Sequence, residues 1–322
     1  MTNTARHQRL GKRLLITALT IATTAFGAAC SVSTPNATST ISPSGPAAPT
    51  PAPRQTVLPF TGLESPHDLA VDTAGNVYVT DLHHSKGEAG LPSVTTRLIK
   101  LPAGSNTQTV LPQFVNADLV ADAAGGVWVI DAGHEQLVKL AAGSSPQTVL
   151  PLPDLGLRSE VLAVDSAGGA YGTDGGGVYP DGGCCRRVNV VKAEAGSHTP
   201  TVLPFTHILG LGGMAVDVAG NVYAGEFKQV LKLAAGTDTQ TVLPLDLGGV
   251  GGMAVDSAGG VYVVDAERKQ VLKLAAGADK PIVLPFSGLN KPVTVAVDAA
   301  GSVYVADIGN HNVVKLNPGD QK

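Results

Sequence analysis

The stretch QTVLPF at residues 55–60 stands ahead of every other repeated element in the chain. Its VLP core recurs at positions 57, 110, 149, 202, 242 and 283, so that successive copies are 53, 39, 53, 40 and 41 residues apart. The last element of the chain, NVVKL at residues 312–316, has no such copy after it. The chain therefore begins with the end of its repeated unit.

Three further short elements separate one VLP from the next. An AVD-like element comes first, an apolar VYV-like element second and a VVKL-like element third, and we name these strands A, B and C, with VLP as strand D. The Asp-x-Ala-Gly stretch between A and B suits a tight hairpin, because Asp bonds turn amides and Gly accepts a positive φ. A period near 40 residues with four short strands per unit predicts a β-propeller.

The order of the strands predicts how the ring closes. Every complete unit reads A-B-C-D, so the chain starts on a D strand and ends on a C strand. We expect residues 55–60 to pair with strand C of the last unit and complete it, which leaves no open edge between the first and last blades. The predicted fold is all-β, a six-bladed propeller over residues 55–318.

The N-terminal region predicts export. Residues 1–29 resemble a signal peptide, with four basic residues followed by an apolar run of 16 residues, too short for a membrane span of about 20. Cys30 follows directly, as in bacterial lipoproteins, and residues 30–54 form a Ser, Thr and Pro tether. We expect lipidation of Cys30 and attachment to the outer side of the cell membrane; the alternative is an ordinary secretory signal and a secreted protein.

The units resemble NHL repeats, most clearly in GNHNVVKL at residues 309–316. The phrases VLPFTGL (57–63) and AVDTAGNVYVTD (70–81) are similar to the extracellular sensor propeller of mycobacterial PknD-type receptor Ser/Thr kinases, over residues 55–318. That resemblance implies a sensor or binding propeller. The sequence has no Gly-rich phosphate loop, His-Arg-Asp or Asp-Phe-Gly motif, so it implies no kinase activity for this chain.

The candidate site lies on one face of the predicted propeller. The two long units owe their length to B–C loops at residues 82–96 and 175–189, which belong to blades 1 and 3 and share a face with the starts of the A strands. Loops on a rigid scaffold commonly carry binding. The candidate ligand-binding residues there are His67, Asp68, His83, His84, Asp118, Arg158, Glu160, Arg186 and Arg187. Blades 4 and 5 place Gly pairs at the same rim, which predicts an open, small-residue arc.

Two metal sites follow from residue types alone. The carboxylates of Asp68, Asp118 and Glu160 suit Ca²⁺ or Mg²⁺, and the alternative is a set of solvated polar residues at a wide pore mouth. Cys184 and Cys185 are adjacent, so a disulfide between them is strained. Free thiols, a bridge to a partner, or zinc shared with His83 and His84 remain alternatives. No other cofactor is expected.

Two sets of charged residues recur in every unit. An acid ends each B strand (Asp81, Asp131, Asp174, Glu226, Asp265 and Asp307), and a lysine lies in each C strand (Lys100, Lys139, Lys192, Lys232, Lys273 and Lys315). Repetition in all units indicates a structural role, such as capping of the B–C turn amides by the acids.

Charge and motifs exclude several functions. The net charge is −4 with scattered Lys and Arg, so nucleic acid is not an expected partner. No Ser-His-Asp signature is visible among the eight histidines. We predict a monomeric, envelope-anchored sensor or protein-interaction module, with an envelope protein, glycan or small ligand as partner. A metal-dependent hydrolase or lyase at the channel mouth and a plain scaffold are the alternatives.

Overall fold

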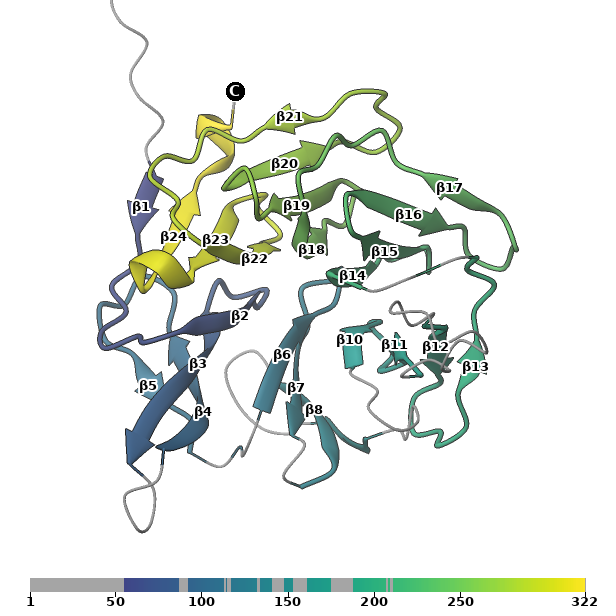
Figure 1. The fold of residues 1–322 in the computed structure, drawn as a ribbon. Helices are drawn as coiled ribbons and strands as arrows, with labels where there is room; N and C mark the ends of the chain where they lie inside the picture. Colours follow the sequence, from purple (N-terminus) through teal and green to yellow (C-terminus); the bar gives the residue numbers. More distant parts are fainter. Residues whose placement is uncertain are drawn as a thin grey trace, which may run out of the picture. The chain divides into compact units, whose positions relative to one another are not determined.

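Repeated A, B, C and D elements build six antiparallel sheets of four strands each in the described residues, and Figure 1 shows these sheets arranged as blades around a centre. The computed structural model describes residues 55–86, 92–112, 114, 117–131, 134–140, 148–152, 161–174, 188–206, 208 and 211–321. All of them lie in the second of two units, residues 51–322. The predicted all-β six-bladed propeller is confirmed.

Blades 1 to 3 come from the first half of the chain. Blade 1 consists of β2 (Pro66–Val71), β3 (Val77–Lys86), β4 (Pro92–Leu101) and β5 (Thr109–Val110). Blade 2 consists of β6 (Ala117–Ala121), β7 (Val127–Asp131), β8 (Gln136–Leu140) and β9 (Thr148–Pro151). Blade 3 consists of β10 (Val161–Val164), β11 (Ala170–Thr173), β12 (Val190–Ala193) and β13 (Thr201–Val202).

Blades 4 to 6 follow the same order. Blade 4 consists of β14 (Gly213–Val216), β15 (Val222–Glu226), β16 (Gln229–Leu233) and β17 (Gln240–Val242). Blade 5 consists of β18 (Val250–Val255), β19 (Val261–Asp265), β20 (Gln270–Leu274) and β21 (Ile282–Val283). Blade 6 consists of β22 (Pro292–Val297), β23 (Val303–Asp307), β24 (Asn312–Leu316) and β1 (Gln55–Val57), with 3₁₀ turns η2 (Ile308–Asn310) and η3 (Pro318–Asp320).

The N-terminal strand closes the ring as the sequence predicts. β1 pairs antiparallel with β24, and Gln55 stands opposite Leu316 while Val57 stands opposite Val314. Leu58 and Phe60, which follow β1, pack against the apolar cluster between blades 6 and 1. Blade 6 is therefore built from both ends of the propeller segment, and the first and last blades share one core.

The core lies at the seams between blades. Each of the larger apolar clusters joins side chains of two neighbouring blades, as when Val79 and Ile99 of blade 1 meet Tyr304 and Val313 of blade 6. Strands β7, β15, β19 and β23 are buried along their whole length. This explains why the B strands read as nearly continuous apolar runs instead of alternating, since both of their faces are covered.

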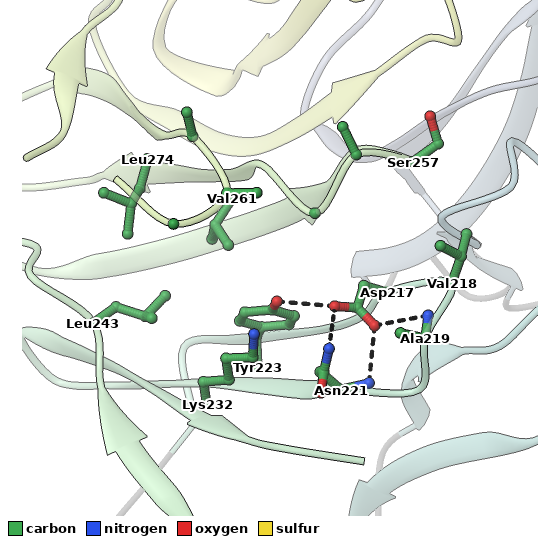
Figure 2. A pocket seen from close by; sticks show the side chains of 15 residues that line it. Asp217, Val218, Ala219, Asn221, Tyr223, Lys232, Leu243, Ser257, Val261 and Leu274 are labelled. Carbon is green, nitrogen blue, oxygen red and sulfur yellow. Dashed lines mark hydrogen bonds between the residues drawn. The ribbon is translucent and has the colours of Figure 1, made fainter. Parts of the chain in front are cut away.

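The aspartate of each A–B turn holds its own hairpin together. In blade 4, Oδ1 of Asp217 accepts the backbone N–H groups of Ala219 and Asn221, and Oδ2 accepts the hydroxyl of Tyr223 at 3.0 Å (Figure 2). The ammonium of Lys232 then lies 5.3 Å from the centre of the Tyr223 ring. This is a cation–π contact, and it confirms a structural role for the strand-C lysine.

The same Asp–aromatic–Lys unit recurs in all six blades, with Trp128 replacing tyrosine in blade 2. The Lys-to-ring distances run from 4.9 to 5.4 Å. Burial, and then the neighbouring carboxylate of Asp165, raises the pKa of Tyr171 to about 12. The same two causes raise the pKa of Tyr78, Tyr223 and Tyr262, and burial followed by the hydrogen bond to Asp298 raises that of Tyr304.

Candidate functional site

The A strands line a central channel with a cavity of about 570 Å³. Strands β2, β6, β10, β14, β18 and β22 succeed one another around it, each in contact with the next. The side chains at the strand starts, among them His67, Asp68, Asp118 and Thr294, form its mouth on the face that carries the B–C turns. The structure therefore brings three of the predicted site residues to one cavity.

A β-bulge shapes the mouth at blade 1. Pro66 pairs with Asp81 and Leu69 with Val79, so His67 and Asp68 together stand opposite the single residue Thr80. Bulges re-aim side chains and are frequent beside active sites. Similar register shifts occur at the starts of β10, β18 and β22. These bulges were not predicted, because nothing in a run such as PHDLAV (66–71) marks the extra residue.

Asp68 has a structural role, since it forms hydrogen bonds within blade 1 and to blade 2. Its Oδ2 accepts the Thr80 hydroxyl at 3.0 Å and the backbone N–H of Leu119 in blade 2 at 3.4 Å. Its own N–H donates to the Thr80 oxygen at 2.9 Å. Asp68 thus ties the bulge to its blade and to the next one, while His67 and Asp118 are exposed at the mouth.

The glycine arc opposite is not open, contrary to the prediction. A Cβ on Gly212 would fall 2.3 Å from the carbonyl oxygen of Val250, and one on Gly252 would fall 2.6 Å from Oγ1 of Thr294. The glycines therefore allow the A strands of blades 4, 5 and 6 to approach closely. Met214 and Met253 complete this wall, so the cavity has a polar arc facing an arc of apolar side chains and backbone.

The predicted metal sites have no complete ligand set in the described part of the chain. Among those residues, no group of three or more His, Cys, Asp or Glu side chains is placed to hold a metal ion. Asp68 and Asp118 both line the cavity, but Glu160 and Arg158 lie outside the described residues. Cys30, Cys184, Cys185, Arg186 and Arg187 also lie outside them, so the predicted lipidation, disulfide and basic loop stay predictions.

The first long B–C insertion is a β-ribbon and not the loop that we expected. β3 and β4 stay paired beyond the body of the blade, from Leu82 opposite Thr96 to Lys86 opposite Pro92. The run SVTT at residues 93–96 contains β-branched residues that favour a strand, and this was the signal for it. The ribbon carries His83 and His84.

Glu64 is a site residue that sequence reasoning missed. Its Oε1 lies 2.5 Å from Nδ1 of His83, and its Oε2 accepts the backbone N–H of His84 at 2.9 Å. Its carbonyl oxygen lies 2.5 Å from Nδ1 of His311 in blade 6. The His84 N–H, and then the charge and hydrogen bond of His83, outweigh partial burial and lower the pKa of the Glu64 carboxyl. No local pattern marks Glu64, because its partners are 19 or more residues away.

The acids that end the B strands have the structural role predicted, but mostly with other amides. Asp81 accepts the backbone N–H groups of Glu64 and Ser65, which lie in the D–A connection before blade 1. Asp265 and Asp307 cap the corresponding connections of blades 5 and 6. Fewer of these bonds involve amides of the B–C turns: the backbone N–H of Asn189 donates to Asp174, and that of Arg268 donates to Asp265. These acids therefore hold the loops on the face of the channel mouth.

Comparisons with known proteins agree with the fold. Residues 289–316, in blade 6, match the NHL repeat. A stretch of 67 residues, 20% of this chain, is 52% identical to the serine/threonine-protein kinase PknD of Mycobacterium tuberculosis, in strains CDC 1551 / Oshkosh and ATCC 25618 / H37Rv. The match spans 9% of the kinase's length.

Solved structures of distant sequence share the architecture. A catalytically inactive virginiamycin B lyase from Staphylococcus aureus with quinupristin aligns at a TM-score of 0.50 and 10% identity, over 82% of this chain and 99% of the lyase. A streptogramin B lyase aligns at a TM-score of 0.50 and 12% identity, over 82% and 97%. At such identity the likeness shows the fold alone. Within the described residues, no helix is long and apolar enough to cross a membrane.

Proposed function

We propose that this NHL-repeat, six-bladed propeller is an exported sensor or interaction module that binds an envelope ligand at the mouth of its central channel. The cavity of about 570 Å³ carries this proposal, because it combines an exposed polar arc with an apolar arc on a rigid ring. The His83–His84 ribbon rises from the same face and gives a partner a second point of contact.

The local similarity to PknD supports a sensing role, since a stretch of 67 residues of this chain is 52% identical to that kinase. This chain has no kinase motif in its sequence, so we propose that it passes no signal by phosphorylation itself. It acts as a monomer that presents its channel to a glycan, a small molecule or a protein of the envelope.

The N-terminal region supports attachment to the membrane. Lipidation of Cys30 and the Ser/Thr/Pro tether of residues 31–54 would hold the propeller at the outer side of the cell membrane. In cells, replacement of Cys30 by serine is expected to move the protein from the detergent phase to the aqueous phase of a Triton X-114 partition. Retention of the Cys30→Ser protein in the detergent phase would contradict the lipid anchor.

A metal-dependent hydrolase or lyase is the competing proposal, favoured by the convergence of His67, Asp68 and Asp118 on one cavity. Thermal unfolding of the mature chain with EDTA, Ca²⁺ or Mg²⁺ separates the two. A ligand present at about 100 times its dissociation constant stabilises by about 2.7 kcal/mol. If Ca²⁺ or Mg²⁺ raises the midpoint of thermal unfolding and Asp118→Ala abolishes this rise, the enzyme proposal is favoured. If neither ion changes the midpoint, the sensor proposal is favoured.

The binding proposal itself is tested with a soluble small-molecule and glycan fraction of the envelope, measured by thermal unfolding. We expect a raised midpoint that the His67→Ala/Asp118→Ala double variant loses. Asp238→Ala removes an exposed carboxylate on the opposite face, in the C–D turn of blade 4, and is expected to keep the shift. An equal shift in all three proteins would place the ligand elsewhere.

A further inference from the structure

The groove between blades 5 and 6, on the face of the A–B turns, is filled by the chain's own C-terminal tail. Gln321 is 8% exposed, and its carboxamide bonds both blades. Its Oε1 accepts from Nζ of Lys273 in blade 5 at 3.3 Å, and its Nε2 donates to the carbonyl oxygen of Gly301 in blade 6 at 2.6 Å. The tail is available for this because strand D of blade 6 comes from the N-terminus, so the chain after β24 turns back through η3.

The groove between blades 4 and 5 has the same framework without a tail. Lys232 corresponds to Lys273, and Gly259, in the A–B turn of blade 5, corresponds to Gly301. Leu243 corresponds to Leu284. These residues line a cavity of about 300 Å³, with Asp217, Tyr223 and Lys232 along one wall and Ser257, Val261 and Leu274 along the other (Figure 2).

Two observations distinguish this second groove from the groove that Gln321 fills. In the described part of the chain, Lys232 Nζ has the ring of Tyr223 as its contact and no hydrogen-bond acceptor. Leu284, in the filled groove, is 1% exposed, whereas the equivalent Leu243 is only partly buried. The framework that holds Gln321 between blades 5 and 6 is thus repeated between blades 4 and 5 with space for one more polar group.

We propose that the cavity between blades 4 and 5 binds a primary carboxamide, as carried by a glutamine side chain, with its oxygen on Lys232 Nζ and its NH₂ on the carbonyl of Gly259. A carboxamide offers both an acceptor and donors, whereas a carboxylate has acceptors alone and cannot satisfy a carbonyl oxygen. The nearby carboxylate of Asp217 also disfavours an anionic ligand. This site shares no lining residue with the central channel and does not depend on the function proposed there.

The full mature chain, labelled with ¹⁵N, is titrated with N-acetyl-L-glutamine methylamide and observed by amide NMR. We expect saturable shifts at Lys232 and Gly259, and an affinity at least about tenfold lower for the glutamate analogue. Propanamide tests the source of the group: equal binding identifies a free amide, and weaker binding identifies a glutamine residue of a peptide. Absence of saturable shifts, or equal binding of the glutamate analogue, would overturn the proposal.

Two variants test whether the probe binds in the cavity between blades 4 and 5. Lys232→Met is expected to weaken binding about tenfold or more, the size of a lost hydrogen bond to a charged group. Ser257→Trp, at an exposed turn position that leaves Lys232 in place, is expected to block the cavity and supports the same conclusion should Lys232→Met fold poorly.

Gln321→Gly is the matched control, because it empties the neighbouring groove. We expect the probe to produce new shifts at Lys273 and Gly301 in this variant, with those at Lys232 unchanged. Shifts at Lys273 in the unsubstituted protein, or none in Gln321→Gly, would show that the two grooves do not share one mode of recognition.

Discussion

Two rings of carboxylates lie on opposite faces of the propeller and are satisfied in different ways. The A–B turn aspartates bond groups four and six residues further along the chain, and they do so alike in every blade. The acids that end the B strands instead bond loop amides 16 or 17 residues earlier, as in blades 1, 5 and 6. The first ring is a local scaffold, whereas the second ring secures the loops around the channel mouth.

The second ring also varies in its side-chain partners. Asp81 pairs with Arg97, Asp131 with His134, Asp265 with Arg268 and Asp307 with Asn310. Burial alone would raise the pKa of Asp265, but the backbone N–H groups of Gly248, Arg268 and Gly249 bring it below its ordinary value. Both faces thus have structural carboxylates, but the A–B turns repeat one arrangement in every blade, whereas the acids around the channel mouth have different side-chain partners from blade to blade.

The largest expected effect comes from Asp81→Ala. Asp81 is fully buried, and its loss leaves the amides of Glu64 and Ser65 without their acceptor and removes the carboxylate partner of the Arg97 guanidinium. Removal of one partner from a buried charged network costs about 3–5 kcal/mol of unfolding free energy. Urea unfolding at pH 7 measures it. The matched control is Asp246→Ala, an exposed partner of Arg268, with an expected loss below about 1 kcal/mol; similar losses in both would break the distinction between buried loop capping and surface pairing.

A smaller loss is expected from the local ring. Asp217→Ala removes the acceptor of the Ala219 and Asn221 amides and of the Tyr223 hydroxyl, at a cost of about 1–3 kcal/mol. Asp217→Asn retains one oxygen acceptor and suits the turn, so urea unfolding is expected to show less than half of that loss. An asparagine variant as unstable as the alanine variant would show that the carboxylate charge, and not the turn geometry, matters here.

The fold could be predicted from the sequence because the contacts that recur in each blade are local or follow from the order of the strands. Asp-x-Ala-Gly marks each A–B hairpin, and the unpaired QTVLPF at the start predicts its place beside β24. The Lys–aromatic pairs follow from strands B and C lying side by side, as Tyr223 opposite Lys232 illustrates. A short pattern that recurs six times needs no knowledge of distant contacts.

The candidate site at the channel mouth was less predictable, because it depends on contacts between blades that the repeated sequence pattern does not specify. Gly212 and Gly252 read as open space, yet the neighbouring A strands occupy the volume that their side chains would take. Glu64 carries no motif, and its role depends on a ribbon and on His311, 247 residues away. No motif marks Gln321 near the C-terminus of the sequence, yet its side chain fills a groove between two blades.

Alkaline pH probes the local ring through its tyrosines. An unfolded tyrosine ionises near pH 10, whereas burial and the adjacent aspartate raise the pKa of Tyr171 to about 12. Between these two values the native state keeps a proton on Tyr171 that the unfolded state releases. The contribution of this tyrosine to the free energy of unfolding is therefore complete below about pH 10 and is lost as pH rises toward 12. We expect tyrosinate absorbance to rise together with loss of the native circular dichroism signal. Ionisation near pH 10 in the folded protein would show that the Asp–Tyr pairs are open to solvent.

The smallest effect is expected at the lysines that cover the aromatic rings. Lys100 lies 5.2 Å from the centre of the Tyr78 ring, and Lys100→Met is expected to cost about 0.5–1 kcal/mol, the size of an exposed cation–π contact. Lys139 also bonds Asp122 and the carbonyl of Ser166 in the next blade, so Lys139→Met is expected to cost about 1 kcal/mol more. Urea unfolding of both variants measures the difference. Equal losses would mean that the bond to Ser166 adds nothing to the contact between blades 2 and 3 on the face of the A–B turns.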